Sequence, residues 1–113
     1  MGDKDCDIDM LVARARREYR LAGDRCKIFG QGLFADPAWN ILLDLVISQA
    51  DRRDISVTAA CIGSRAPAAT ASRYIAMLLA AGLIEQVADV RDGRRKFLHL
   101  TPRAWDGMMR LLG

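Results

Sequence analysis

The chain has 113 residues, half of them apolar, and 17 basic against 14 acidic side chains give it a net charge of +3. This length predicts one core that needs no disulfide staple. Three cysteines without Cys-x-x-Cys spacing argue against a disulfide framework or a zinc site. One histidine, with no glycine-rich phosphate loop and no Gly-x-Ser-x-Gly sequence, gives enzyme chemistry no support. The cysteine pattern makes a reducing cytosol the simplest compartment, so we expect a cytoplasmic protein. No apolar run approaches the ~20 residues of a membrane span.

The first predicted helix covers residues 8–21, where apolar side chains recur at spacings of three and four. Alternating aspartates precede this helix, and Gly23 is expected to end it. Residues 1–35 are therefore expected to form an acidic tail, a helix and a linker. Within the linker, Leu33 and Phe34 are expected to plug into the core.

Asp36 and Pro37 predict the start of a second helix. A carboxylate can cap the first turn, and a proline is pre-organised for the first helical position. Apolar residues lie on two sides of this helix. We therefore expect it to be buried from two directions.

A short third helix is predicted to run from Ser56, its N-cap, to Ile62, with Ala59, Ala60 and Ile62 facing inward. The glycine that follows, Gly63, is expected to supply the positive φ of a tight turn. Two helices joined by so short a turn form a helix-turn-helix.

The fourth helix is predicted over residues 67–81, with Pro67 in its first turn, Ser64 as its cap and Gly82 at its end. The residues expected on its inward face are Ala71, Ile75 and Leu78. This helix is the second of the helix-turn-helix pair, the one that reads the partner in such motifs.

A hairpin is predicted at residues 84–100, with its turn around Asp92. Thr101 and Pro102 then predict the start of a last helix. The apolar residues expected on one face of that helix are Trp105, Met108, Met109 and Leu112. This order of elements predicts a mainly α fold with a small β-wing, a winged helix-turn-helix, over residues 36–113.

The outward face of residues 67–81 suits the major groove of double-stranded DNA, where short or polar side chains let a helix approach the base edges. Arg73 can make a two-pronged contact to guanine, and Thr70 can bond a phosphate or touch a thymine methyl. Ser56 and Thr58, at the start of the preceding helix, are placed to hold phosphates. Alternatively, Arg73 is a surface arginine paired with a carboxylate. The helix residues assigned to DNA are Ala69, Thr70, Ser72 and Arg73.

The hairpin is the second predicted DNA contact. Its tip carries the basic residues Arg91, Arg94, Arg95 and Lys96. A narrow minor groove concentrates negative potential and attracts an inserted arginine. Asp89 or Asp92 is expected to pair with a neighbouring arginine and so to shape the tip. The alternative is a solvated hairpin tip that binds nothing.

One line of residues runs through the fourth helix and the hairpin: Ser72-Arg73, Leu78, Gly82-Leu83-Ile84, Asp89-Val90-Arg91-Asp92-Gly93-Arg94-Arg95 and Leu98-His99-Leu100-Thr101. It resembles the hallmark of the MarR-like family of bacterial winged helix-turn-helix transcriptional regulators, within a match over about residues 37–105. The resemblance implies a symmetric dimer on a palindromic operator, often released by a small ligand. It also implies a recognition-helix role for Arg73, a minor-groove role for Arg94 and a supporting carboxylate in Asp92.

The resemblance departs from the family at the C-terminus. Typical members continue into long helices that build the dimer, whereas this sequence has only the short helix predicted after Thr101. The first and last helices are then the candidates for a dimer surface, through Leu11, Ala15, Tyr19, Trp105 and Met109. The arginines of the first helix could contact flanking phosphates, or only solvate a dimerising helix. These arginines are Arg14, Arg16, Arg17 and Arg20.

Two functions from different classes stand at this point. The first is a nucleoid-associated homodimer that binds double-stranded DNA and regulates transcription, with an unidentified small-molecule effector. The second is a winged-helix module that binds a protein through the same faces and does not bind DNA. Neither function calls for a cofactor or a metal ion.

Overall fold

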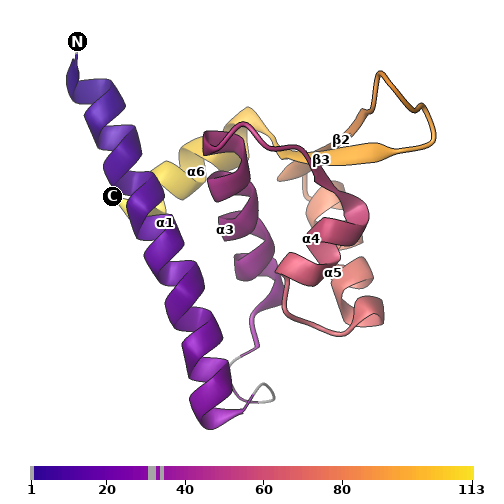
Figure 1. The fold of residues 1–113 in the computed structure, drawn as a ribbon, viewed down its shortest axis with the longest axis horizontal. Coiled ribbons are helices and arrows are strands. Elements are labelled where there is room, and N and C mark those ends of the chain that lie inside the picture. Colours follow the sequence, from indigo (N-terminus) through magenta and orange to yellow (C-terminus); the bar gives the residue numbers. More distant parts are fainter. Residues whose placement is uncertain (1, 31–32, 34) are drawn as a thin grey trace.

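The computed structural model describes residues 2–30, 33 and 35–113, without the side chains of residues 2–6. Its described helices are α1 (Gly2–Phe29), α3 (Pro37–Ala50), α4 (Val57–Gly63), α5 (Ala68–Ala80) and α6 (Pro102–Leu112). Three antiparallel strands, in the order β1-β3-β2, are β1 (Ile55–Ser56), β2 (Ile84–Ala88) and β3 (Lys96–Leu100). Figure 1 shows α3 between α1 on one side and α4 with α5 on the other, while the β2–β3 hairpin projects from the body. The fold is a winged helix-turn-helix, as predicted.

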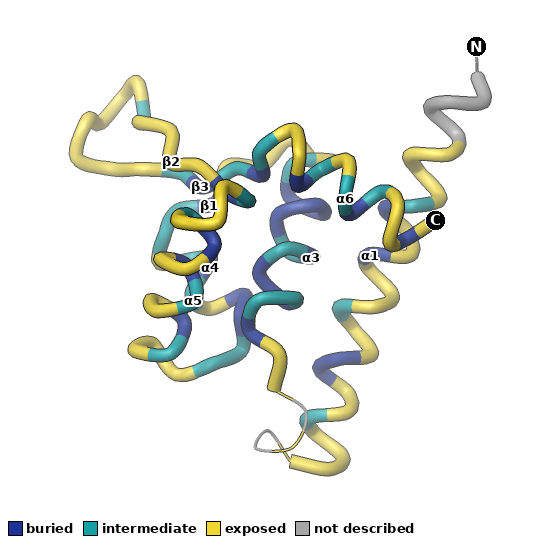
Figure 2. Tube along the Cα trace, turned by 180° about the vertical axis from the view of Figure 1, so that it is seen from behind, coloured by how far each residue is buried: buried dark blue, intermediate teal, exposed yellow. Residues whose placement is uncertain are grey.

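The central helix, α3, begins as its sequence predicted. The Asp36 carboxylate accepts a hydrogen bond from the Trp39 N–H at 3.2 Å, and Pro37 occupies the first turn. Apolar side chains on several sides of α3 are almost fully buried: Ile41, Leu43, Leu45 and Val46. Figure 2 shows α3 as the most continuously buried helix, which confirms burial from two directions.

α1 is longer than predicted at both ends, because it begins at Gly2, within the expected acidic tail, and continues past Gly23 to Phe29. Ala22 and Gly23 are buried and Cys26 is half-buried, so the inward stripe of this helix continues beyond residue 21. Packing of α1 on α3 offsets the cost of a glycine inside a helix, about 1 kcal/mol. The helix ends at Gly30, whose φ is +99° and whose N–H donates to the Cys26 carbonyl at 2.8 Å.

Two residues expected in the core lie at the surface instead. Leu33 is 80% exposed and Ile62 is 74% exposed. In α4 the buried residue is Ala60, and side chains two positions apart on a helix point about 200° away from each other. Ala60 and Ile62 therefore cannot both face inward. Phe34 lies outside the described residues.

The sheet contains a strand, β1, that the sequence did not predict, because two residues are too few for a detectable alternation. Ile55 of β1 pairs with Leu98 of β3, which also pairs with Gln86 of β2. The carbonyl oxygen of the Gln49 side chain, on α3, accepts a hydrogen bond from the Leu100 N–H at 2.6 Å. These contacts fix the base of the hairpin to the helical core.

The last helix, α6, closes the core on the side of α1 and β3. Thr101 caps it, because the hydroxyl oxygen accepts a hydrogen bond from the Ala104 N–H at 3.2 Å. The same hydroxyl donates to the Gly82 carbonyl at 2.8 Å, at the point where the chain leaves α5. Met108 and Leu112 are buried, as the predicted apolar face requires.

Candidate nucleic-acid interface

The first two turns of α5 present a face of short side chains to solvent. Ala69, Ser72 and Arg73 are exposed, and Thr70 is half-buried. The opposite face is buried as predicted, through Ala71, Ile75 and Leu78. Because the side chains around Arg73 on this face are short, another molecule can approach the helix backbone closely there.

Arg73 is accessible to an external partner. Its guanidinium carbon lies 5.8 Å from the centroid of the neighbouring Tyr74 ring. Among the residues that the structure describes, no carboxylate forms an ion pair with Arg73. Pairing with a surface carboxylate therefore does not account for this arginine.

The start of α4 carries the two predicted phosphate contacts. Ser56 caps this helix, since its hydroxyl oxygen accepts a hydrogen bond from the Ala59 N–H at 3.1 Å. Ser56 is half-buried and Thr58 is exposed. Thr58 is thus the more accessible of the two hydroxyls.

The hairpin tip is shaped by its own carboxylates. Asp89 Oδ1 accepts a hydrogen bond from the Arg91 N–H at 2.8 Å, and Asp92 Oδ1 accepts one from the Arg94 N–H at 3.0 Å. The Arg95 N–H donates to the Asp92 carbonyl, also at 3.0 Å. Each carboxylate thus contacts a neighbouring arginine, but through the backbone N–H of that arginine and not through its guanidinium. The backbone amides take that role, because an Asp side chain easily reaches an amide two residues on.

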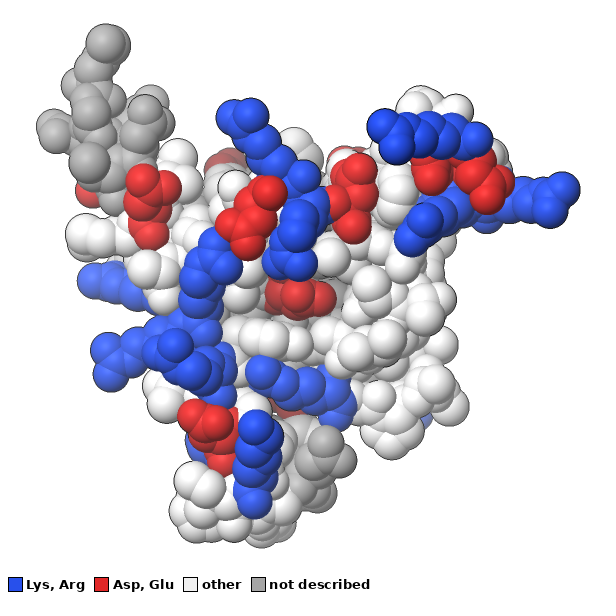
Figure 3. Space-filling view, viewed as in Figure 1, with Lys and Arg blue, Asp and Glu red and all other residues white. Residues whose placement is uncertain are grey.

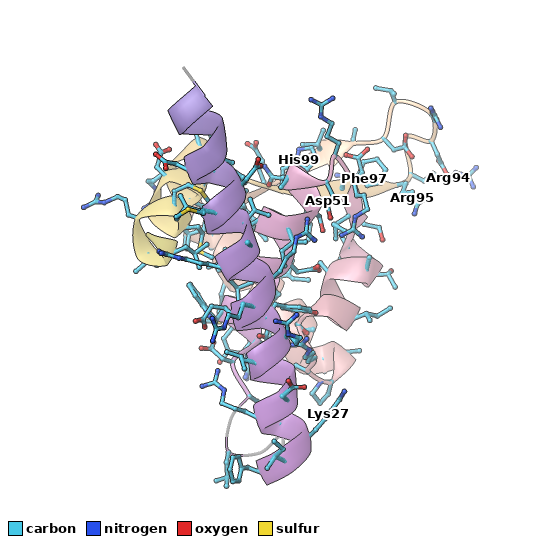
Figure 4. The ribbon with its side chains drawn as sticks, turned by 60° about the vertical axis from the view of Figure 1, so that its left-hand side comes forward. Lys27, Asp51, Arg94, Arg95, Phe97 and His99 are labelled. Atoms are coloured by element: carbon cyan, nitrogen blue, oxygen red, sulfur yellow. The ribbon has the colours of Figure 1, made fainter. Side chains whose placement is uncertain are left out.

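An open groove of about 660 Å³ separates α4 from the hairpin. It brings together most of the predicted phosphate and wing contacts, since its lining includes Ser56, Thr58, Arg94, Arg95 and Lys96. Arg95 is held over the Phe97 ring, 5.5 Å from its centroid. Figure 4 shows Arg94 and Arg95 on the hairpin beyond Phe97 and away from α1.

Arg91 does not line this groove. It lines a second depression, of about 620 Å³, together with Asp54 and His99. His99 Nε2 lies 3.3 Å from Asp54 Oδ1, a contact that 45 positions of separation hide from sequence reasoning. The described residues contain no cluster of three or more side chains suited to a metal ion.

On the face shown in Figure 3, basic side chains lie along α1 and on the hairpin, and basic and acidic side chains lie together along the top between them. The surface below the hairpin is largely uncharged. On α1, Arg14 donates to the Leu112 carbonyl at 2.7 Å, and Arg16 pairs with Asp51 at 2.5 Å. The Arg16 hydrogen bond lowers the pKa of the Asp51 carboxyl. These two arginines therefore tie α1 to α6 and to the end of α3, while Arg17 and Arg20 are exposed.

The residues predicted for dimerisation pack within the chain itself. Ala15 is fully buried in the core, so it has no surface to offer a second copy. Tyr19 is half-buried and contacts the turn between α4 and α5. Leu11, Trp105 and Met109 are half-buried against the same core.

The turn between α4 and α5 differs from its prediction. The positive φ, +60°, belongs to Arg65 and not to Gly63. Gly63 has a different role, because it leaves room for the Asp44 carboxylate, which a Cβ at that position would displace. Ser64 does not cap α5, since its hydroxyl donates back to the Cys61 carbonyl at 2.6 Å. Sequence reasoning missed Arg65 because its contacts come from α1.

No protein-family profile and no curated protein sequence matches this chain. Solved structures do match it. A Staphylococcus aureus MepR–DNA complex matches with a TM-score of 0.57 at 20% identity, over 85% of this chain and 73% of that one. A point mutant of the same protein gives 0.58 at 18%, over 86% and 66%. The PcaV transcriptional regulator from Streptomyces coelicolor, with its natural ligand, gives 0.54 at 24%, over 69% and 52%.

These likenesses show that the chain has the winged helix-turn-helix fold of MarR-family regulators, at low sequence identity. The chain spans 66% of the length of the MepR mutant and 52% of the length of PcaV. A heme sensor protein, PefR from Streptococcus agalactiae, matches in complex with heme, with a TM-score of 0.55. None of the described helices is both long and apolar enough to cross a bilayer.

Proposed function

We propose that the protein is a cytoplasmic transcriptional regulator that binds double-stranded DNA sequence-specifically through α5 and the hairpin, and that it is not an enzyme. The observation that carries the proposal is the groove in which Thr58 of α4 faces Arg94 and Arg95 of the hairpin. α5, which packs on α4, exposes Arg73 among short side chains. The MepR–DNA complex, which has the same fold, adds support.

In this proposal α5 enters the major groove. Arg73 donates two hydrogen bonds to a guanine, and Thr70 touches a phosphate or a thymine methyl group. Ala69 and Ser72 keep the helix surface low. Thr58 and Ser56 bind phosphates that fix the register of the protein on the duplex without reading sequence.

The hairpin, residues 84–100, enters the adjacent minor groove. Arg94 is the inserted arginine, drawn by the negative potential of a narrow groove. Arg91 and Arg95 neutralise phosphates beside it. Asp89 and Asp92 support the tip by binding backbone amides, which leaves the guanidinium groups free to face DNA.

We further propose a homodimer and a small-molecule effector. The twofold symmetry of a palindromic operator requires two copies. PcaV, solved with its natural ligand, and PefR, solved with heme, have the same fold, which supports an effector for this chain as well. Trp105 and Met109 on α6 and Leu11 on α1 are the half-buried apolar residues from which a dimer surface could be completed.

The test is fluorescence anisotropy of a labelled mixed-sequence duplex across a salt series. Affinity should fall steeply as salt rises, because phosphate contacts release bound counterions. Arg73→Ala should weaken binding to an operator selected from random-sequence DNA by about tenfold, since a two-pronged base contact contributes about 1–3 kcal/mol. Arg94→Ala should weaken binding and also flatten the salt dependence.

Arg110→Ala is the matched control, because Arg110 is an exposed arginine on α6, outside the proposed interface. It should bind DNA like the wild type. Absence of salt-sensitive binding at low ionic strength would overturn the proposal, and so would binding that neither Arg73→Ala nor Arg94→Ala weakens.

One observation favours the second candidate, a module that binds a protein through the same groove. Ile62, 74% exposed, lines the groove beside Thr58, where an apolar side chain suits a protein partner better than a phosphate. If this candidate holds, Ile62→Ser should abolish a protein complex, and the wild type should show no salt-sensitive binding of a duplex. Intact DNA binding with no protein partner in a pull-down would remove this candidate.

A further inference from the structure

The turn between α4 and α5 holds an arginine in a backbone conformation that suits glycine. Arg65 has a φ of +60°, which residues with a side chain rarely adopt. Such a conformation persists where the surrounding structure holds it in place. The contacts of the Arg65 side chain are therefore what holds this conformation in place.

The side chain of Arg65 reaches back to α1. Its Nη1 donates a hydrogen bond to the Tyr19 carbonyl at 2.5 Å, and its Cζ lies 3.7 Å from the centroid of the Tyr19 ring. Gly23, one turn further along α1, makes room for this guanidinium. A Cβ at Gly23 would lie 2.9 Å from the Arg65 Cζ. Gly23 thus accommodates the guanidinium in this position.

Tyr19 holds the same turn through a second contact. Its hydroxyl donates to the Gly63 carbonyl at 2.6 Å. Burial raises the pKa of Tyr19, so the hydroxyl keeps its proton at neutral pH and remains a donor. From α3, Asn40 Nδ2 donates to the Ser64 carbonyl at 3.1 Å. Two successive carbonyls of the turn are therefore held by side chains of α1 and α3.

We propose that Tyr19 and Arg65 are positioning residues, which dock the turn at residues 63–65 onto α1 and so set the position in which α5 meets DNA. α5 begins at Ala68, three residues after Arg65. A shift of the turn therefore moves the first turns of α5, where Arg73 lies. This inference rests on the proposed function, because DNA affinity is one of its two readouts.

Two variants open this docking in different ways. Tyr19→Phe keeps the ring under the guanidinium and removes the hydroxyl. Arg65→Gly removes the guanidinium but relieves the positive φ, so the turn itself loses strain. Arg25→Ala is the matched control, because Arg25 is an exposed arginine on the same helix.

The two measurements are amide hydrogen exchange across the chain without DNA, and duplex anisotropy over a salt series. Both variants should exchange faster at residues 63–70, with the rest of the chain unchanged. Both should weaken operator binding between about threefold and tenfold, the range for one lost hydrogen bond. In Tyr19→Phe the salt dependence should stay as in wild type, because no phosphate contact is lost. General loss of stability would instead accelerate exchange everywhere.

Wild-type exchange at residues 63–70 in both variants would overturn the docking. Arg25→Ala weakening DNA binding as much as Arg65→Gly would also overturn it, since the effect would then be one of charge and not of position. If Arg65→Gly fails to fold, Tyr19→Phe carries the test. If the wild type binds no duplex, the proposed function fails, while local acceleration of exchange still supports the docking of the turn on α1.

Discussion

The two tight turns of this winged helix-turn-helix, at residues 63–65 and 89–95, are held by opposite means. At the hairpin tip, Asp89 and Asp92 bind backbone amides two residues further along. At the turn between α4 and α5, the partners of Gly63 and Arg65 include Tyr19, more than 40 positions away. The hairpin tip is exposed, while Gly63 is buried. The hairpin tip is thus held by contacts within a few residues, whereas the turn between α4 and α5 is held by contacts that form only when the chain folds.

The difference matters for function, because each turn carries a different part of the proposed interface. A locally held tip can keep its shape while it projects into a groove of DNA, without support from the core. The buried turn lies just before α5 and is held by Tyr19 of α1, so in our proposal a change at Tyr19 shifts α5. The same substitution should therefore affect stability strongly at the turn between α4 and α5 and weakly at the hairpin tip.

The largest expected effect comes from adding one methyl group to each turn. Gly63→Ala should destabilise the protein by about 1 kcal/mol or more in urea unfolding. Overpacking costs about 1–3 kcal/mol, offset in part by the better helix propensity of alanine. Gly93→Ala should change stability by less than about 0.5 kcal/mol, because nothing lies within 4 Å of the added Cβ.

A second substitution locates the cause of the Gly63 effect. Asp44→Ala removes the carboxylate that meets the added methyl group, so combining it with Gly63→Ala should recover stability relative to the sum of the single changes. Equal losses for Gly63→Ala and Gly93→Ala, or strict additivity with Asp44→Ala, would break the comparison between the two turns.

An intermediate effect is expected at the hairpin, where the role of Asp92 can be separated from its charge. Asp92→Ala should weaken operator binding by about threefold, since the Arg94 N–H loses its acceptor and the tip loosens. Asp92→Asn keeps an acceptor oxygen and removes a negative charge, so it should bind DNA at least as tightly as wild type. Anisotropy measures both. Equal losses in the two variants would point to the charge of Asp92.

The smallest effect should be a pH dependence at the buried turn. Burial raises the pKa of Asp44 from its ordinary value of 3.8, while Arg53 and Arg65 act in the opposite direction. Because the folded state then binds the proton more readily than the unfolded state, stability falls as pH rises from the ordinary to the folded pKa. Asp44→Asn should therefore be more stable than wild type at neutral pH, with the advantage vanishing at low pH.

Asp51 supplies the contrasting case for that measurement. The Arg16 hydrogen bond lowers its pKa, so its contribution is present above 3.8 and is lost as pH falls through the lower folded value. Asp51→Asn should be less stable than wild type at neutral pH. Thermal unfolding between neutral and acidic pH should give the two variants shifts of opposite sign, and shifts of the same sign would contradict the assignment.

Much of the fold could be predicted because its signals are local. Asp36 and Thr101 cap their helices by accepting a hydrogen bond from the N–H three positions further along the chain. The Asp92-Gly93 turn closes the hairpin within a few positions. The C-terminal end of α1 was mispredicted, because a glycine after an apolar stripe is typical of a helix end. The contact between Gly23 and the Arg65 guanidinium cannot be seen in the sequence. The strand β1 was missed because its pairing with β3 spans more than 40 positions.

The sequence by itself determined the order of the later helices and of the hairpin, the caps at Asp36, Ser56 and Thr101, the buried face of α5 and the cluster of arginines at the hairpin. All of these depend on spacings of a few residues, which helix and strand periodicity translate directly into structure. Only the tertiary structure decided which arginines hold the fold and which remain open. Arg65 and Arg16 are bound by Tyr19 and Asp51, while Arg73 and Arg94 face solvent. An arginine side chain is long enough to serve either purpose, and the choice depends on which distant groups folding brings within its reach.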